Sequence, residues 1–280
     1  MDKILPTVAA VALMYAVPSQ AATIGIDQVY QTPAGERQTA GVAMPGDGSL
    51  YALDDQVARQ FDPMNLIGPV GQIPNGSSTG GRDATGIGNL LYVLDGTNSV
   101  EPLRLTDGAT AGIRSIDDGP ITNPIALGSF SLGATNYLVG FDNNGFDVYE
   151  LSSDGLSLTY DASKSGSFAS PILGDLRGGD AWAAPGATSM NQVAIFGVND
   201  SEIIDIYDGN GSKFAQLGTD GIGDIEDLTY DGLHFYGNTD GRRGHSEVFR
   251  TNEVQFIVPE PTSLAGGLAG LIALAMRRRR

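Results

Sequence analysis

The chain has no cysteine and only two histidines among its 280 residues. Without cysteine it can form neither a disulfide nor a thiolate nucleophile, so its stability must come from burial and backbone hydrogen bonds. The sequence also contains no His-Glu-x-x-His zinc motif, no Gly-x-Ser-x-Gly elbow and no Walker loop. These are the signatures of zinc hydrolysis, serine nucleophiles and phosphate binding. Their absence favours a protein that is not an enzyme.

Lysine is also scarce, and the 33 acidic residues outnumber the 16 basic ones. The formal net charge is −17, and the lysines are Lys3, Lys164 and Lys213. Removing residues 1–22 and 258–280 takes away one acidic and one basic residue at the first end and four arginines with Glu260 at the second, which changes −17 to −20. So acidic a surface disfavours nucleic acid as a partner and favours solubility and divalent cations.

Helical periodicity is absent as well. Almost no window places apolar residues at positions i, i+3, i+4 and i+7, whereas 39 glycines and 14 prolines punctuate the chain, many of the glycines beside Asp or Asn. Turn residues at this density, between short apolar runs, are typical of an all-β fold.

A short apolar and aromatic run that ends in Asp or Asn recurs along the chain. It occupies residues 50–54, 91–95, 138–142, 195–199 and 233–238. The steps between the terminal Asp or Asn residues are 41, 47, 57 and 39 residues. A period in the forties is typical of β-propeller blades, each of which cannot bury both of its faces alone.

Further runs flank each of these segments. A second run follows each one, so that the two predict a hairpin, and strands before and after it bring the unit to four strands. We therefore expect residues 23–257 to form a five-bladed β-propeller. Residues 24–27 resemble the recurring run, and they are a candidate for a sixth blade or for closing the ring against residues 253–257. A β-sandwich or a solenoid is the alternative fold. The runs resemble those of bacterial propeller proteins, a likeness that names no activity.

The N-terminus has the pattern of a secretory signal peptide over residues 1–22. Lys3 precedes an apolar segment, and Ser19, Gln20 and Ala21 supply the small residues that a signal peptidase requires. The apolar segment of about fourteen residues is short for a membrane-spanning helix. We expect the chain to be exported and cut near Ala22.

The C-terminus, residues 258–280, combines three features in order. Pro259, Glu260 and Pro261 end any regular structure, and residues 262–276 are almost wholly apolar. Four arginines then close the chain: Arg277, Arg278, Arg279 and Arg280. As a helix the apolar run is about 22 Å long, shorter than a hydrocarbon core of roughly 30 Å, and the arginines favour the cytoplasmic surface.

These three features closely resemble the PEP-CTERM sorting signal of Gram-negative bacteria. The resemblance implies an exosortase as a processing enzyme, transient insertion of the C-terminal transmembrane helix into the inner membrane, and a final location at the cell surface or in the extracellular matrix. It also implies a biofilm or exopolysaccharide setting. We expect a non-catalytic surface protein that uses its propeller as an interaction scaffold for carbohydrate. The alternative is a calcium-dependent propeller hydrolase or lyase that acts on a polysaccharide or a phosphoester.

Trp182 is the candidate for a ligand-binding face. It is the single tryptophan of the chain and stands in the longest stretch between repeats, and insertions of propellers tend to gather on the binding face. The adjacent carboxylates at residues 54–55, 117–118 and 226–227 are more typical of turns and solvated strand edges than of an acid and base pair.

Calcium is the one cofactor that the sequence suggests. Residues 200–240 carry ten carboxylates against one cation, Lys213. Asp220, Asp224 and Glu226 lie in or beside a glycine-rich segment, where side chains and backbone carbonyls could together supply the six to eight oxygens that calcium prefers. The spacing does not match an EF-hand. A solvated acidic edge that blocks strand pairing is the competing interpretation.

Overall fold

The computed structural model describes residues 22–33, 41–54, 56–76, 82–94, 98–116, 118–219, 223–239, 246–256 and 258. This part of the chain consists of strands, turns and one short 3₁₀ helix, η2 (Met190–Gln192), without an α-helix. Within it no helix is long and apolar enough to cross a membrane. The predicted signal peptide up to Ala21, and the C-terminal signal from Pro259 to Arg280, lie outside the described residues.

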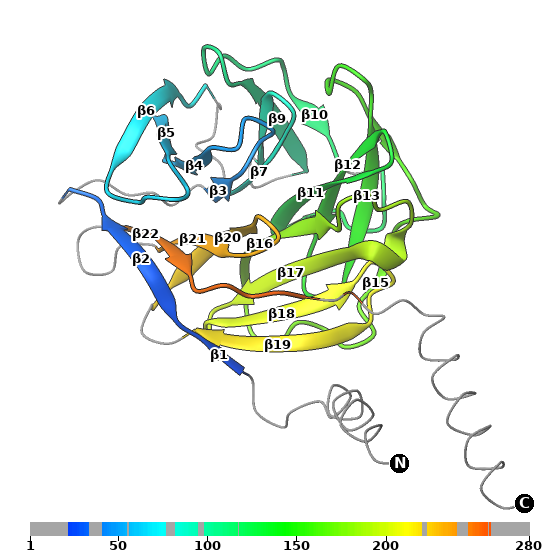
Figure 1. The fold of residues 1–280 in the computed structure, drawn as a ribbon. Coiled ribbons are helices and arrows are strands. Elements are labelled where there is room, and N and C mark those ends of the chain that lie inside the picture. Colours follow the sequence, from blue (N-terminus) through cyan, green and yellow to red (C-terminus); the bar gives the residue numbers. More distant parts are fainter. Residues whose placement is uncertain are drawn as a thin grey trace, which may run out of the picture.

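The strands form five sheets that follow one another around an axis (Figure 1). Blade 1 contains β3 (Gly41–Ala43), β4 (Leu50–Leu53), β5 (Val57–Phe61) and β6 (Pro69–Pro74). Blade 2 contains β7 (Asp83–Ile87), β8 (Leu90–Leu94), β9 (Ser99–Arg104) and β10 (Arg114–Ser115). Blade 3 contains β11 (Ala126–Leu132), β12 (Thr135–Phe141), β13 (Gly145–Leu151) and β14 (Leu158–Tyr160), with β15 (Gly166–Ser167) paired to β13.

Blade 4 contains β16 (Leu176–Ala183), β17 (Val193–Asn199), β18 (Ile203–Asp208) and β19 (Lys213–Thr219). Blade 5 contains β20 (Ile225–Tyr230), β21 (Phe235–Thr239) and β22 (Glu247–Thr251). The first strand of each blade lies innermost, and the five inner strands contact one another in the order β3, β7, β11, β16, β20 and back to β3. The described residues therefore form a closed five-bladed β-propeller, as the sequence predicts.

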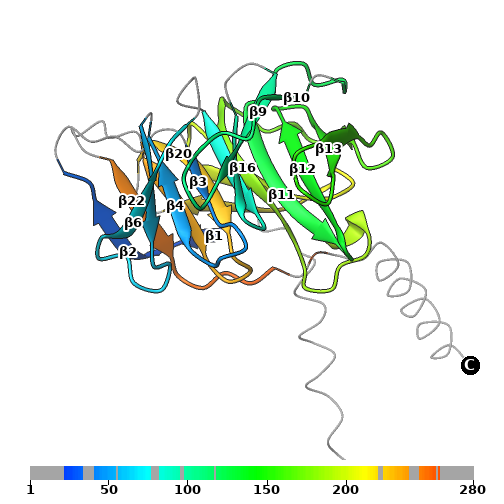
Figure 2. The ribbon, with the colours of Figure 1, turned by 90° about the horizontal axis from the view of Figure 1, so that it is seen from above.

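The N-terminal segment closes the ring. β2 (Ile26–Gln31) pairs with β22 as the outer strand of blade 5, and β1 (Ala22–Ile24) pairs in parallel with β19 of blade 4 (Figure 1, Figure 2). The expected sixth blade is wrong, because residues 24–27 belong to these added strands. The expected closing partner at residues 253–257 is also wrong, since residues 253–256 form no strand and β22 takes that place.

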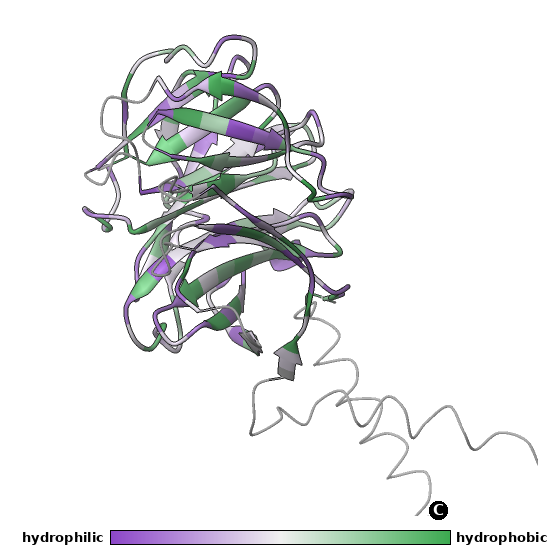
Figure 3. Ribbon diagram, turned by 90° about the vertical axis from the view of Figure 1, so that its left-hand side faces the viewer, coloured by the Kyte–Doolittle hydropathy of each residue, from purple (hydrophilic) through white to green (hydrophobic). Residues whose placement is uncertain are grey.

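The recurring apolar run is the second strand of each blade, and it is buried on both faces. In β4, Leu50 and Ala52 pack toward blade 5, whereas Tyr51 and Leu53 pack toward blade 2. All four side chains are at most 3% exposed. Apolar and polar residues alternate along many of the other strands (Figure 3). A strand with one face in water would alternate apolar and polar residues. The recurring run is apolar on both faces because a neighbouring blade covers each face.

In blades 1, 3 and 4 the Asp or Asn that ends the run turns the chain into the third strand. The Asp54 Oδ1 atom accepts hydrogen bonds from the backbone N–H groups of Gln56 and Val57 at 2.8 and 2.7 Å. Asp142 and Asn199 make equivalent bonds in blades 3 and 4. This local bonding is why Asp and Asn are favoured at these turns, and it explains the polar end of these three repeats. In blade 5, Asn238 lies within β21 and pairs with Val248 of β22.

Glycine lets the inner strands approach one another closely. A Cβ atom at Gly128 of β11 would lie 2.4 Å from the backbone nitrogen of Ala181 in β16. At Gly41, whose φ is +123°, a Cβ atom would lie 2.5 Å from the backbone nitrogen of Ala84. Such distances exclude any side chain, so glycine at these positions allows the neighbouring inner strands to approach this closely.

The segment after β22 folds back over blades 4 and 5. The Val254 N–H donates to the Leu233 carbonyl at 2.7 Å, and the Phe256 ring lies 5.2 Å from Tyr230 and 5.8 Å from Phe196. Val258, the last described residue, packs against the same apolar cluster. The folded part therefore continues up to the residue before Pro259.

Candidate functional site

Two carboxyl groups, Asp83 and Asp227, meet at the centre of the axis. Both are 0% exposed, and they are hydrogen-bonded to each other. Burial is the main cause that holds the pKa of Asp83 well above its ordinary value and raises the pKa of Asp227 to about 8. At least one carboxyl of the pair is therefore protonated at neutral pH and donates its O–H to the other.

This pair also accepts one backbone N–H group from each of the five inner strands. Asp227 accepts from Val42 of β3 at 2.7 Å, Gly179 of β16 at 3.0 Å and Leu228 of β20 at 2.6 Å; Asp83 accepts from Ala84 of β7 at 2.6 Å and Leu127 of β11 at 2.8 Å. The inner edge of a blade has no neighbouring strand to bond, so these N–H groups would otherwise be buried without partners. The pair therefore joins all five blades.

A third carboxylate, Asp180, lies further along the same axis. It is 5% exposed and comes from β16. Its Oδ2 accepts the Thr229 hydroxyl at 2.6 Å, and its Oδ1 lies 3.2 Å from the Thr85 hydroxyl and 3.3 Å from the Ser129 backbone nitrogen. Burial raises the pKa of Asp180 to about 6, although these hydrogen bonds oppose the shift.

One short motif builds both layers. Asp83 and Thr85 stand two residues apart in β7, and Asp227 and Thr229 stand two residues apart in β20. A step of two residues keeps the same side of a strand and advances about 7 Å. The aspartates therefore meet each other while the threonines reach Asp180.

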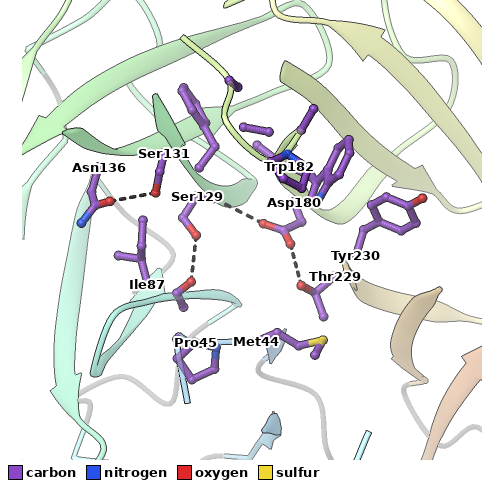
Figure 4. A pocket seen from close by; sticks show the side chains of 18 of the residues that line it. Met44, Pro45, Ile87, Ser129, Ser131, Asn136, Asp180, Trp182, Thr229 and Tyr230 are labelled. Atoms are coloured by element: carbon purple, nitrogen blue, oxygen red, sulfur yellow. Dashed lines mark hydrogen bonds between the residues drawn. The ribbon is translucent and has the colours of Figure 1, made fainter. Parts of the chain in front are cut away.

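Asp180 is part of the floor of a pocket at the end of the axis where the inner strands finish. The pocket has a volume of about 510 Å³, which falls within the usual range for small-molecule sites. Figure 4 shows the Asp180 carboxylate between Ser129 and Thr229, with Trp182 and Tyr230 beside it. Met44, Pro45 and Ile87 add apolar surface, and Ser131 and Asn136 lie at the edge.

The aromatic wall of the pocket depends on the C-terminal segment. The Trp182 and Tyr230 rings are in edge contact, with centroids 5.5 Å apart at 80°. The Tyr230 hydroxyl donates to the Val254 carbonyl, and Phe256 packs against the Tyr230 ring. Residues that follow the last blade therefore hold Tyr230 in place behind Trp182.

Trp182, the predicted ligand-face residue, lines this pocket. Its location differs from the expectation, because it stands in the inner strand β16 and not in an inserted loop. The insertion is the stretch between β14 and β16. The end of an inner strand is a more rigid support than a loop, and the role of Trp182 in ligand binding stays a prediction.

The predicted calcium ligands do not gather in the described residues. Asp224 has a φ of +60°, and its backbone N–H donates to Glu202 Oε1 at 3.3 Å. Glu226 is half-buried in β20, beside an irregularity between Ile225 and Asp227. Asp220 lies outside the described residues. No group of three or more His, Asp or Glu side chains in the described part could hold a metal ion. Calcium binding stays a prediction.

The expectation that the paired carboxylates belong to turns holds for Asp54 and is wrong for Asp227. The three axial aspartates were missed because each one stands in or beside an apolar run, where a single acidic residue gives no periodic signal. The repeated Asp-x-Thr motif of blades 2 and 5 is the signal that could have found two of them.

Comparisons with known proteins support the fold and give no family or activity for this chain. No protein-family model matches the chain, and no curated protein matches it. Among solved structures, the chain is similar to the glutaminyl cyclase of Myxococcus xanthus, with 12% identity, a TM-score of 0.50 and coverage of 84% of this chain and 100% of that one. It also matches the Pan2 WD40 domain of Neurospora crassa at 10% identity and a TM-score of 0.36, over 77% of this chain and 64% of that one.

Proposed function

We propose that the chain is an exported, non-catalytic scaffold protein whose propeller binds carbohydrate in the axial pocket. The observation that carries this proposal is the composition of the pocket. Trp182 offers a partly exposed indole on which the apolar face of a sugar ring can pack. Asp180, Ser129 and Ser131 provide the acceptors and donors that sugar hydroxyls need.

The binding experiment uses oligosaccharide tetramers and isothermal titration calorimetry. We expect the purified protein to bind at least one tetramer, and Trp182→Ala to weaken that binding about tenfold, since a stacking platform is removed. Leu173→Ala is the matched control, because Leu173 is 71% exposed and does not line the pocket. If Trp182→Ala binds the tetramer as tightly as wild type, the sugar does not pack on Trp182, and binding in the axial pocket is contradicted.

Sorting through the C-terminal signal is the second part of this proposal. Two features of the described residues are compatible with it: β1 starts at Ala22, and Val258, just before Pro259, still packs against the apolar cluster of blades 4 and 5. Cuts near Ala22 and Pro261 would leave all five blades complete. Intact-mass measurement of secreted protein tests this, and material that still carries Arg277 to Arg280 would contradict it. Replacing Pro259, Glu260 and Pro261 with alanines should leave an uncut form in the inner membrane.

A hydrolase or lyase that acts on polysaccharide or phosphoester is the second candidate. It is favoured by Asp180, whose pKa of about 6 suits a general acid or base. However, glycoside hydrolysis requires two carboxyls across the substrate, and Asp180 is the one acidic side chain among the described residues that line the pocket. Release of reducing ends by wild type and not by Asp180→Asn would favour this candidate.

A further inference from the structure

The pocket carries negative charge with no compensating cation. Among the described residues that line it there is no lysine, arginine or histidine. All hydrogen bonds recorded to Asp180 come from uncharged donors, namely two threonine hydroxyls and backbone N–H groups. Buried carboxylates are ordinarily paired with a cation, because the desolvated charge is costly alone. Within the described part of the chain, no cationic side chain that lines the pocket therefore balances the charge of Asp180.

The Asp180 carboxylate also has acceptor capacity left. A carboxylate has about four acceptor positions. The Oδ2 atom accepts a hydrogen bond from the Thr229 hydroxyl, and Asp180 itself lines the pocket. A donor that enters the pocket could bond there without displacing the threonine.

The neighbouring rings favour the same sign of charge. Trp182 and Tyr230 stand beside Asp180 (Figure 4), and aromatic faces attract cations. Tyr230 contributes its ring alone, since its hydroxyl already donates to the Val254 carbonyl. A ligand that combines an ammonium group with hydroxyls would meet the carboxylate, the aromatic wall and the serine hydroxyls together.

We propose that the axial pocket is specific for a cationic sugar, namely an amino sugar in its ammonium form, and that the ammonium group bonds to the Asp180 carboxylate. This inference rests on the proposed carbohydrate binding and adds to it the class of sugar. A neutral or N-acetylated sugar would leave the buried carboxylate without a counterion. An acidic sugar would be repelled by it.

The test compares three tetramers that differ in charge: a β-1,4-glucosamine tetramer, its N-acetylated counterpart and cellotetraose. Calorimetry at pH 7 and 150 mM salt should give the glucosamine tetramer an affinity at least tenfold higher than either neutral tetramer. Asp180→Asn should reduce this preference to less than twofold. Leu173→Ala, a surface variant outside the pocket, should keep the preference, because Leu173 is 71% exposed and does not line the pocket.

Lower pH provides a second measurement that needs no variant. Asp180 is faced by Thr85, Ser129, Thr229 and the carboxyl of Asp227, and protonation of its carboxylate removes the negative charge at the floor of the pocket. The preference for the glucosamine tetramer should therefore decline as pH falls through about 6, the pKa of Asp180, to pH 5, even though the sugar amines become more fully protonated over the same interval.

The possible outcomes separate the two proposals. Equal binding of all three tetramers overturns the amino-sugar specificity and leaves carbohydrate binding intact. A preference that persists in Asp180→Asn, or is unchanged at pH 5, shows attraction to the acidic surface as a whole and also overturns the specificity. Binding of none of the tetramers at millimolar concentration overturns the proposed function itself.

Discussion

The Asp83–Asp227 pair and Asp180 lie on the same axis. Asp180 is at the level of Thr85 and Thr229, which follow the paired aspartates by two residues in their strands. The two sites differ in the donors that they bond. The pair accepts five backbone N–H groups, one from each blade. Asp180 accepts from two threonine hydroxyls as well as from backbone N–H groups, and it lines an open pocket. Backbone donors cannot move aside, whereas hydroxyls can rotate toward a ligand. Burial of a carboxyl is therefore common to both sites, and the hydroxyl donors together with the open pocket distinguish the Asp180 site, where we propose that a ligand binds, from the Asp83–Asp227 pair.

The strongest way to test this comparison is to remove the centre of the pair. Asp227→Ala would leave the N–H groups of Val42, Gly179 and Leu228 without acceptors. Each buried unsatisfied group costs about 1–3 kcal/mol, so we expect the free energy of unfolding to fall by about 3–5 kcal/mol in urea denaturation.

The control for that variant is Asp83→Asn. Its amide nitrogen can donate to Asp227 but cannot accept a backbone N–H, so one of the two bonds from Ala84 and Leu127 is lost and we expect a smaller loss than for Asp227→Ala, about 1–3 kcal/mol. Equal losses from the two changes would mean that the backbone bonds contribute little.

The second test uses pH. Because burial raises the pKa of both members of the pair in the folded state, the folded protein keeps its protons above the pH at which unfolded aspartate loses them, near 3.9. The contribution of the pair to stability is therefore largest at low pH and declines as pH rises toward about 8, the pKa of Asp227.

Urea denaturation at pH 5 and pH 8 measures this decline, which we expect to be about 1–3 kcal/mol. Asp83→Asn removes one titrating group and should make the decline smaller. A wild-type stability that rises over this interval would show that the pair does not carry a shared proton.

The smallest effect is expected at Asp180. Asp180→Asn removes a buried charge while it keeps an acceptor for Thr229. We expect the free energy of unfolding to change by less than about 1 kcal/mol, and the melting temperature measured by circular dichroism to stay within a few degrees. A loss as large as that of Asp227→Ala would make Asp180 part of the structural core and would weaken its assignment to binding.

The Trp182 prediction illustrates how far sequence carried the site. Trp182 lines the axial pocket, and its role in ligand binding stays a prediction. Its contact with Tyr230 joins residues that are 48 apart, and the support of Tyr230 by Phe256 joins residues that are 26 apart, which no local pattern specifies.

Local features of the sequence were enough to determine the all-β class and the five repeating units. An apolar run such as residues 50–53 is buried on both faces, and the Asp54 that follows caps its own turn, so both signals are written within a few residues. Only the tertiary structure decided how the ring closes through β2 and β22, and that Asp83, Asp180 and Asp227 share one axis. The reason is physical: ring closure brings together inner strand edges from the whole chain, and the bonds that a carboxyl makes there depend on neighbours that are distant in sequence.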